Sequence, residues 1–569
     1  MGLFSKDHEK HSDQDVSDGF EPTTDVQEGM LSDNSDDLQR HLANRQIQLI
    51  AIGGSIGTAL FVSIGQGLYH GGAGSLLIAY TLQSCMLALV NNSIAEMSIA
   101  YPVSGGFIRL AGKWCDDALG FMLGWNFFFY EALLIPFEIS ALNLIIGFWS
   151  PAITQPGPTA GICIGCIVAY AAINILAVRA YGEAEFWLSG GKVILIFSLF
   201  FFTFISMVGG NPQGDAYGFR YWEDGQAFRA RYEGGSLGKF EGFLSALWSA
   251  AFTVVGPEYI SMVAAEAKRP RTYIKTAFKT VYFRFGLFFI GGALAVGIVC
   301  SSRDPALERI TNGGGSSTAA ASPYVIAMRN LNVKIFPHIV NALLMTSIFS
   351  AGNTYTYAAV RSLYGLALEG RAPSFLTYCT KNGVPIWCFC VVMCFPFLSF
   401  LQVSGGSAEA ITWLSTLITA GALIDYIGMA ITFICFHRAC KAQGLDRRTL
   451  PYFGWFQPYG AYVAVVWFSI ITMFYGYLAF RPAWSVEGFF QNYTMQIVDP
   501  ILFISWKLIK KTKWKSVYEV DLVWERPTID AYEATFLDPP VGFWTEMLQL
   551  VGLRRNKGGN DKRQGSITN

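Results

Sequence analysis

The chain contains twelve apolar segments, each long enough for an α-helix to cross a bilayer. About 20 consecutive apolar residues suffice for one crossing. The segments cover residues 49–69, 73–99, 120–149, 159–178, 187–209, 242–265, 280–300, 335–358, 384–402, 409–436, 460–480 and 489–509. Only 14% of the 569 residues are charged, whereas a soluble domain carries about a quarter. The sequence therefore predicts an all-α polytopic membrane protein with twelve transmembrane helices.

Basic residues are distributed unevenly between the connections, although the net charge is zero, with 41 Lys and Arg against 41 Asp and Glu. The connections at 150–158 and 403–408 contain no Lys or Arg, whereas five lie between residues 268 and 279. Five lysines also fall between residues 507 and 515, at the end of the last apolar segment. Because basic residues favour the cytoplasmic side, we expect both termini in the cytoplasm.

The two ends of the chain differ in composition from the region between them. Residues 1–37 are acidic, rich in serine and poor in apolar residues, which is typical of a disordered tail rather than of a signal peptide. We therefore expect a disordered cytosolic N-tail at 1–37, a twelve-helix membrane domain at 38–510 and a cytosolic C-tail at 511–569.

Residue patterns that carry enzymatic or metal chemistry are missing from the sequence. Cys163 and Cys166 lie in an apolar segment without accompanying His or Cys ligands, which favours packing over metal binding. The sequence contains no nucleophile–base grouping and no phosphate-binding G-x-x-x-x-G-K-[ST] loop. We expect no enzymatic activity, no metal, no cofactor and no nucleic-acid partner.

The first apolar segment is weakened by small residues in the stretch AIGGSIGTALFV at 51–62. Glycine inside a helix is less favourable than alanine by about 0.5–1 kcal/mol and frees the backbone to leave helical geometry. We expect the helix to break between Gly53 and Thr58. The alternative is a close helix crossing of the small-xxx-small kind, formed by Gly53 and Gly57.

A second interruption is expected in the sixth segment, in AFTVVGPEYI at 251–260. Pro257 has no backbone donor and kinks a helix, and a helix crossing does not explain the Gly256-Pro257-Glu258 sequence. The two segments are five apart, and interruptions at corresponding positions of two halves predict an inverted-repeat transporter with its site at the bilayer midplane. Free N–H groups at one break suit a carboxylate, and free carbonyls at the other suit an ammonium group, so a zwitterion is the expected ligand.

Ionisable residues inside apolar segments are functional candidates, because a charge at the helix centre costs at least about 2.5–3.5 kcal/mol. Glu131 and Glu138 share one face of the third segment, and Glu131 could equally be structural. Asp425 either pairs with a buried polar group or adds a fixed negative charge that favours ligands with a second cationic group. Lys192 either changes protonation state during transport, because burial disfavours its charged form, or pairs permanently with a carboxylate such as Glu138 or Glu258. Glu258 is also placed to cap the N–H groups freed at the second break.

Several segments together carry a family resemblance that covers about residues 38–510. The chain resembles the fungal amino-acid permeases of the amino acid–polyamine–organocation (APC) superfamily, and most closely the branch linked to general amino acid, carnitine and polyamine uptake or sensing. The segments are RQIQLIAIGGSIGTALF (45–61), GFMLGWNFFFYEALLIPFEISA (120–141), AYGEAEFWLSGGKVI (180–194), VGPEYISMVAAEAKRPR (255–271), VGIVC (296–300), SPYVIAM (322–328) and SAGNTYTYAAVRSLYGLALEGRAP (350–373).

The resemblance implies a 5+5 inverted-repeat core of the LeuT-like fold plus two extra helices, in a proton-coupled symporter of the plasma membrane. It also implies that trafficking or ubiquitin-ligase adaptors bind the tails. The alternative is a nutrient receptor that senses amino acids, carnitine or polyamines with little transport.

The same resemblance assigns residues to the site. It implies that Glu138 takes part in substrate binding or coupling, and that Lys192 lies beside the first break as the proton-coupling residue. The residues implied to hold the α-carboxylate are Ser55, Ile56, Gly57 and Thr58, and those around the α-amino group are Phe252, Thr253 and Gly256. The residue patterns themselves, independently of the resemblance, predict helix breaks at Gly53, Gly54, Pro257 and Glu258.

Overall fold

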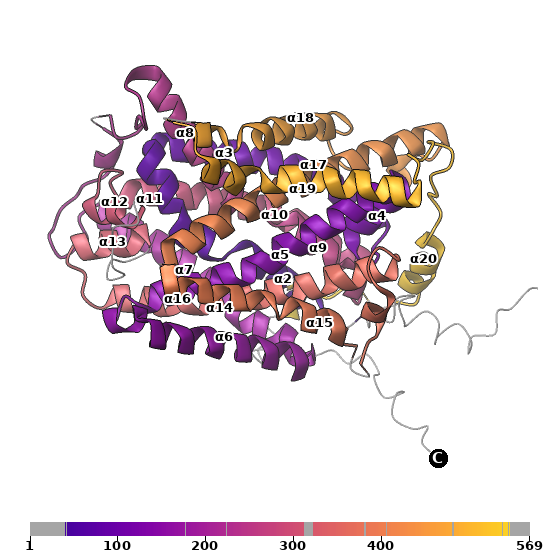
Figure 1. Cartoon of the computed structure of the whole chain (residues 1–569), viewed down its shortest axis with the longest axis horizontal. Helices are drawn as coiled ribbons and strands as arrows, with labels where there is room; N and C mark the ends of the chain where they lie inside the picture. Colours follow the sequence, from indigo (N-terminus) through magenta and orange to yellow (C-terminus); the bar gives the residue numbers. More distant parts are fainter. Residues whose placement is uncertain are drawn as a thin grey trace, which may run out of the picture.

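The computed structural model describes residues 40–546 except 41, 177, 224, 312–321, 381–382, 406, 481–482, 537–538 and 544. The described chain is helical apart from two isolated β-bridges and the connections between helices. Most of the long helices lie along one common direction (Figure 1). They are α3 (Ile64–Ala100), α5 (Asp117–Ile146), α6 (Pro156–Leu176), α7 (Val178–Met207), α14 (Phe336–Leu368), α17 (Ser407–Ala442) and α19 (Val486–Lys510).

The remaining helices are shorter, and several continue one another across a break. The series α2 (Asn44–Ser55), a π-helix at Ala59–Ser63 and α3 forms one such path, and α3 turns at Gly72, where φ is +82°. Others of this kind are α8 (Gly235–Thr253) with α9 (Pro257–Met262), α10 (Pro270–Arg284) with α11 (Gly291–Val299), and α15 (Ile386–Val392) with α16 (Leu401–Gly405). Helix α18 covers Tyr459–Phe474, and short connecting helices are α4 (Gly106–Trp114), α12 (Pro305–Thr311), α13 (Pro323–Asn330) and α20 (Arg526–Ala534).

Seven helical segments of the described chain are long and apolar enough to cross a membrane. Each of the twelve apolar segments of the sequence overlaps a helix. The structure therefore agrees with an all-helical membrane fold, while the number of crossings stays a prediction.

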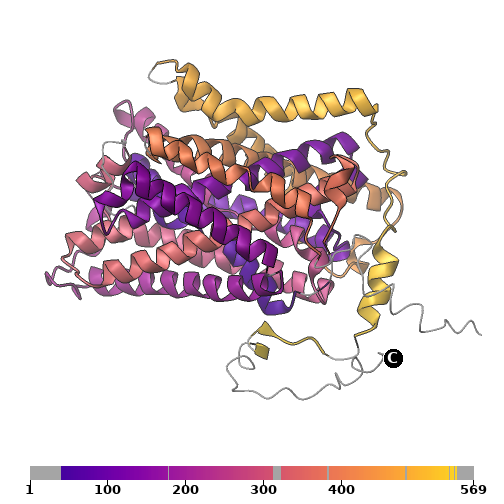
Figure 2. The ribbon, with the colours of Figure 1, turned by 60° about the horizontal axis from the view of Figure 1, so that its bottom comes forward.

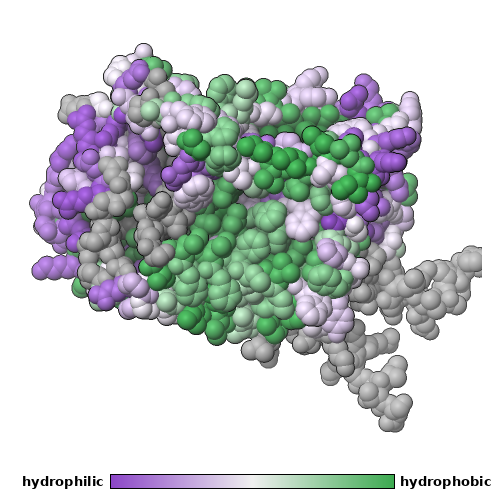
Figure 3. Space-filling view, viewed as in Figure 1, coloured by the Kyte–Doolittle hydropathy of each residue, from purple (hydrophilic) through white to green (hydrophobic). Residues whose placement is uncertain are grey.

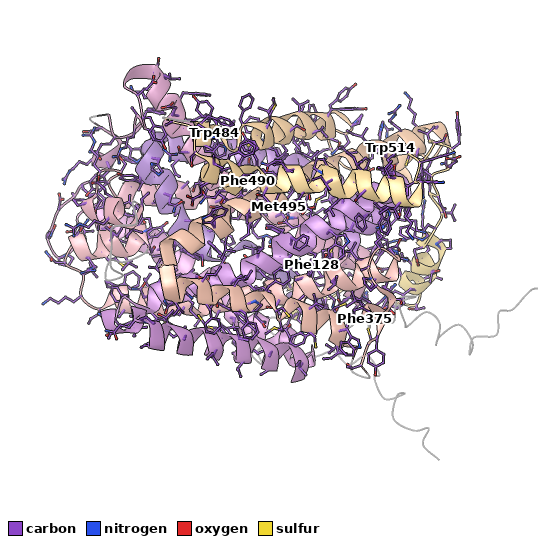
Figure 4. The ribbon with its side chains drawn as sticks, in the orientation of Figure 1. Phe128, Phe375, Trp484, Phe490, Met495 and Trp514 are labelled. Atoms are coloured by element: carbon purple, nitrogen blue, oxygen red, sulfur yellow. The ribbon has the colours of Figure 1, made fainter. Side chains whose placement is uncertain are left out.

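The surface has a hydrophobic band between two hydrophilic ends (Figure 3). Trp484 and Trp514 lie near opposite ends of α19 (Figure 4) and are 54% and 49% exposed. Exposed tryptophans at both edges of an apolar band are typical of the two membrane–water interfaces. We refer to the two ends of the bundle by the short helices that lie there, as the α12 end and the α20 end (Figure 1).

Helix α5 lies at the centre of the bundle and packs against α14 and α17, while α3 packs against α8. Most residues of α5 are apolar and buried, which is expected of a helix surrounded by other helices. Helix α2 packs against α7, α9 and α14. This arrangement brings the ends of α2, α8 and α9 together in the interior.

Beyond α19 the chain leaves helical geometry at Lys511, where φ is +52°, and runs along the α20 end (Figures 1 and 2). We call its described residues, 511–536, 539–543 and 545–546, the C-terminal strap. Val520, Leu522 and Ile529 of the strap are buried, so this part of the chain packs on the helix bundle.

Candidate functional site

The first interruption lies between α2 and the π-helix. Helix α2 ends at Ser55, and Ile56 is extended, with φ −120° and ψ 98°. Gly53 and Gly54 stay helical, in contrast to the expectation that the break begins there. A Cβ atom built on Gly54 would lie 2.9 Å from the ring of Tyr259. Gly54 therefore permits close packing, and the break itself falls at Ile56 and Gly57.

Glu138 of α5 fills the space beside this break. The hydroxyl of Thr58 donates a hydrogen bond to Oε2 of Glu138, and its backbone N–H lies 3.4 Å from Oε1. A Cβ atom built on Gly57 would lie 2.8 Å from the same Oε1. The Thr58 N–H expected to bind a substrate carboxylate is therefore bound to a carboxylate of the protein. The N–H of Ile56 bonds to Ile52 O within α2, and the side chain of Ser55 is outside the described part of the chain.

Lys192 of α7 is fully buried. It interacts electrostatically with Glu138 of α5. Helix α7 also packs against α2, the helix that ends at the first break. The structure therefore brings Lys192, Glu138 and Thr58 together at the first break.

The second interruption lies between α8 and α9. Val254 is extended and Gly256 has φ +147°, a conformation that favours glycine, before Pro257 begins α9. Both carboxylate oxygens of Glu258 lie 3.1 Å from the N–H of Gly256, and the hydroxyl of Tyr426 donates to Oε1 at 3.2 Å. Glu258 thus caps the N–H group freed by the break, which was one of its expected roles.

The last two residues of α8 face different neighbours. The Oγ1 atom of Thr253 accepts a hydrogen bond from Tyr80 at 2.9 Å and donates to Ser249 O at 2.8 Å. The ring of Phe252 packs edge-to-face on Phe137, with 5.3 Å between the ring centroids. Phe137 is adjacent to Glu138 in α5, so Phe252 lies between the two breaks.

Asp425 of α17 belongs to the second break and not to the first. It is buried, and its charged neighbours are Asp499 of α19 and Glu258. Glu131 of α5 is also buried and interacts electrostatically with Glu258 and Asp425. The ionisable candidates therefore form two groups, with Glu138 and Lys192 at the first break and the other acids at the second.

A family model for amino acid permeases matches residues 46–518, which include both breaks. The chain belongs to the amino acid permease family. Its relatives include "General amino acid permease AGP2" of Saccharomyces cerevisiae, 43% identical over 87% of this chain and 84% of the relative. The "Proline-specific permease" of Emericella nidulans is 35% identical over 86% and 89%. The "Lysine/arginine permease CAN1" of Candida albicans is 32% identical over 84% and 82%.

These comparisons confirm the resemblance to fungal amino-acid permeases. Membership of the family, together with the apolar helices, supports a multi-pass membrane protein and implies an amino acid transporter rather than an enzyme. The relatives are named as a general amino acid permease, a proline-specific permease and a lysine/arginine permease, so family membership leaves the substrate of this permease open.

Three tyrosines between the breaks were missed by the sequence interpretation. The hydroxyl of Tyr355 in α14 donates to Gly54 O at 3.1 Å, and its ring centroid lies 6.1 Å from that of Tyr259 in α9. The hydroxyls of Tyr259 and Tyr130 are 3.4 Å apart. Nothing in the sequence distinguishes these from the other tyrosines among the 26 of the chain.

Arg284 was also missed, although a signal was available. It is buried at the end of α10, directly before a π-helix at Phe285–Ile290. Its Nη1 donates to Ala51 O at 2.5 Å, and it interacts electrostatically with Glu258. Arg284 thus links the helix before the first break to the acid at the second. An arginine inside an apolar segment is rare enough to mark a functional residue.

Proposed function

We propose that this permease is a proton-coupled symporter that carries amino acids and related amine-bearing zwitterions across the plasma membrane by alternating access. The observation that carries the proposal is the pair of buried helix interruptions, each with ionisable side chains against it. Interrupted helices at corresponding positions of two halves are typical of such transporters. The proposal includes twelve crossings, a 5+5 inverted-repeat core with two extra helices, a permease domain at 38–510, and the α20 end in the cytoplasm.

The geometry at the first break supports a mechanism in which proton uptake by Glu138 is coupled to binding of the substrate carboxylate. Glu138 holds the Thr58 N–H and hydroxyl while Lys192 provides the balancing positive charge. A proton taken up by Glu138 weakens its hold on these donors, because a neutral acid is a poorer acceptor than a carboxylate. The substrate carboxylate then binds the donors at the break. The positive charge of Lys192 favours the ionised form of Glu138, so Lys192 controls the uptake of this proton and with it the coupling. Proton and substrate therefore bind together.

The second break supplies the site for the substrate amino group. Helix α8 ends at Thr253 and α9 begins at Pro257, so the carbonyls of the last turn of α8 beyond Ala250 receive no hydrogen bond from a continuing helix. Carbonyl oxygens and the nearby acids favour a cationic group. A zwitterion therefore spans the two breaks, with its carboxylate toward Thr58 and its ammonium group toward Gly256.

The test is uptake by proteoliposomes that contain the purified permease and carry an imposed proton gradient. We expect a labelled neutral amino acid to accumulate, and the accumulation to collapse when a protonophore is added. Competition by acidic, basic, carnitine-like and polyamine compounds then ranks the substrates. Ligand binding without filling of the vesicles would contradict the proposal and identify a nutrient receptor.

A further inference from the structure

The C-terminal strap reaches the beginning of α2, the helix that leads to the first break. Oε2 of Glu546 accepts a hydrogen bond from the backbone N–H of Arg45 at 2.8 Å. The side-chain amide of Asn44 lies 3.4 Å from Val541 O. A carboxylate at the first N–H groups of a helix satisfies donors that have no partner within the helix and interacts favourably with the helix dipole. The end of the strap therefore acts as a cap on α2.

The strap also holds the segment that follows α9, the helix after the second break. The hydroxyl of Tyr532 in α20 donates to Lys268 O at 2.9 Å. Oε1 of Glu533 accepts from the N–H of Arg271 at 2.8 Å, and Asp530 forms an ion pair with the guanidinium of Arg271. Both helices that are interrupted inside the bundle are thus bound at their outer ends by the same part of the chain.

A β-bridge joins these two outer ends to each other. The N–H of Leu42 donates to Glu266 O, and the N–H of Lys268 donates to Leu42 O, each at 3.0 Å. Leu42 precedes α2, and the segment at 264–268 follows α9. The outer ends of the two interrupted helices therefore form one unit.

The first part of the strap is attached elsewhere, to residues at the ends of α3, α4 and α17. The hydroxyl of Tyr101 donates to Leu522 O at 2.6 Å, and Nε1 of Trp114 donates to Asp521 O at 3.1 Å. The amide of Gln443, beyond α17, donates to Val520 O at 2.7 Å. These three contacts use backbone carbonyls of the strap, which fixes the path of its main chain. The strap therefore bridges α4 and α17 to the unit that carries α2 and α9.

We propose that the C-terminal strap is a latch that keeps the α20 end of the permease closed. It must release the unit of α2 and α9 before the site opens at that end. Contacts made in one of two conformations shift the equilibrium toward that conformation, so each strap contact favours closure. This inference rests on the alternating access proposed above, and it adds the regulation of that cycle by the tail.

The latch is tested by the accessibility of α2, which needs no transport. Ile47 of α2 is fully buried, so a cysteine at this position, Ile47→Cys, reacts slowly with a maleimide applied at the α20 end while the permease is closed. Glu546→Ala combined with Tyr532→Phe removes one contact to each interrupted helix. We expect the labelling rate of the cysteine to rise at least fivefold in this variant, after subtraction of the rate from the same protein without Ile47→Cys.

The matched control is Glu519→Ala. Glu519 also belongs to the strap and its Oε2 accepts a hydrogen bond from the N–H of Ser516 at 3.0 Å, within the strap itself. The control is expected to leave the labelling rate unchanged. An unchanged rate in the Glu546→Ala, Tyr532→Phe variant would overturn the latch, whether or not the permease proves to be a proton symporter.

A cross-link gives a second measurement if the first variant folds poorly. Arg45→Cys with Glu546→Cys places two cysteines at the contact between the strap and α2. We expect oxidation to abolish uptake while ligand binding persists, and a reductant to restore uptake. Undiminished uptake by the oxidised, cross-linked protein would show that α2 moves without releasing the strap, and the latch would be rejected.

Discussion

Replacement of Gly57 tests the first break most directly, because the structure leaves no room for a side chain there. A Cβ atom at this position would lie 2.8 Å from Oε1 of Glu138, 3.1 Å from the Cβ of Ala351 and 3.3 Å from the hydroxyl of Tyr355. Ala351 is buried in helix α14 and cannot move without displacing that helix. The added methyl group therefore has to displace the Glu138 side chain. In Gly57→Ala we therefore expect Glu138 to lose its hydrogen bonds to Thr58.

The size of the effect follows from the hydrogen bonds that the substrate carboxylate makes to the Thr58 donors in the proposed complex, because the added methyl group blocks them. A hydrogen bond to a charged group contributes about 1.5–3 kcal/mol, and the added methyl group also occupies the place of the substrate carboxylate. A loss of about 3 kcal/mol corresponds to roughly a hundredfold weaker binding, because 1.4 kcal/mol is a factor of ten. Gly57→Val, with a branched side chain, is expected to abolish binding while the protein still reaches the membrane.

The assay is equilibrium binding of a labelled amino acid to purified permease that elutes as a single species in gel filtration. Gly165→Ala in α6 is the control, because a Cβ atom there meets no atom within 4 Å. Its affinity should equal that of the unchanged protein. If Gly57→Ala binds within threefold of the unchanged permease, the substrate carboxylate is held elsewhere and the assignment of the first break is wrong.

Four further substitutions examine the charged residues. Lys192→Ala should keep ligand binding but lose accumulation driven by a pH gradient in proteoliposomes, and accumulation that still follows the gradient would exclude Lys192 as the coupling residue. Asp425→Asn should weaken basic or polyamine competitors more than neutral ones, whereas an equal loss would leave a structural role. Arg284→Gln should reduce uptake at least tenfold, since it leaves Glu258 without its balancing charge. Adding Glu258→Gln should recover part of the maximal rate, and a further loss in the double variant would refute this pairing.

The second break could be located from the sequence because its residues act locally. Pro257 removes a donor and Gly256 adopts φ +147°, and both properties belong to the residues themselves. The first break could be located only within 53–58, because a glycine inside a helix permits either unwinding of the helix or close packing against a neighbouring helix. Gly54 packs against Tyr259, a residue more than two hundred positions away, and this choice depends on the tertiary structure.

Which residues the ionisable side chains contact at the site also depends on the tertiary structure. Buried ionisable residues can be found from the sequence, because their cost in a membrane makes them rare. The sequence does not say that Thr58 meets Glu138 while Asp425 meets the acid at the other break. The contacts of the strap are still harder to predict from the sequence. Val520, Asp521 and Leu522 make them through backbone carbonyls, which every residue type carries.

In the proposed arrangement of twelve crossings, helix α19 is the last crossing, and its length relates the permease to the thickness of the bilayer. Its 25 residues correspond to a length of about 38 Å at 1.5 Å per residue, against a hydrocarbon core of about 30 Å. Such a helix tilts in a thin bilayer and stands more upright in a thick one. Because the strap begins at Lys511, where α19 ends, a change in lipid composition that alters bilayer thickness shifts the point from which the strap departs.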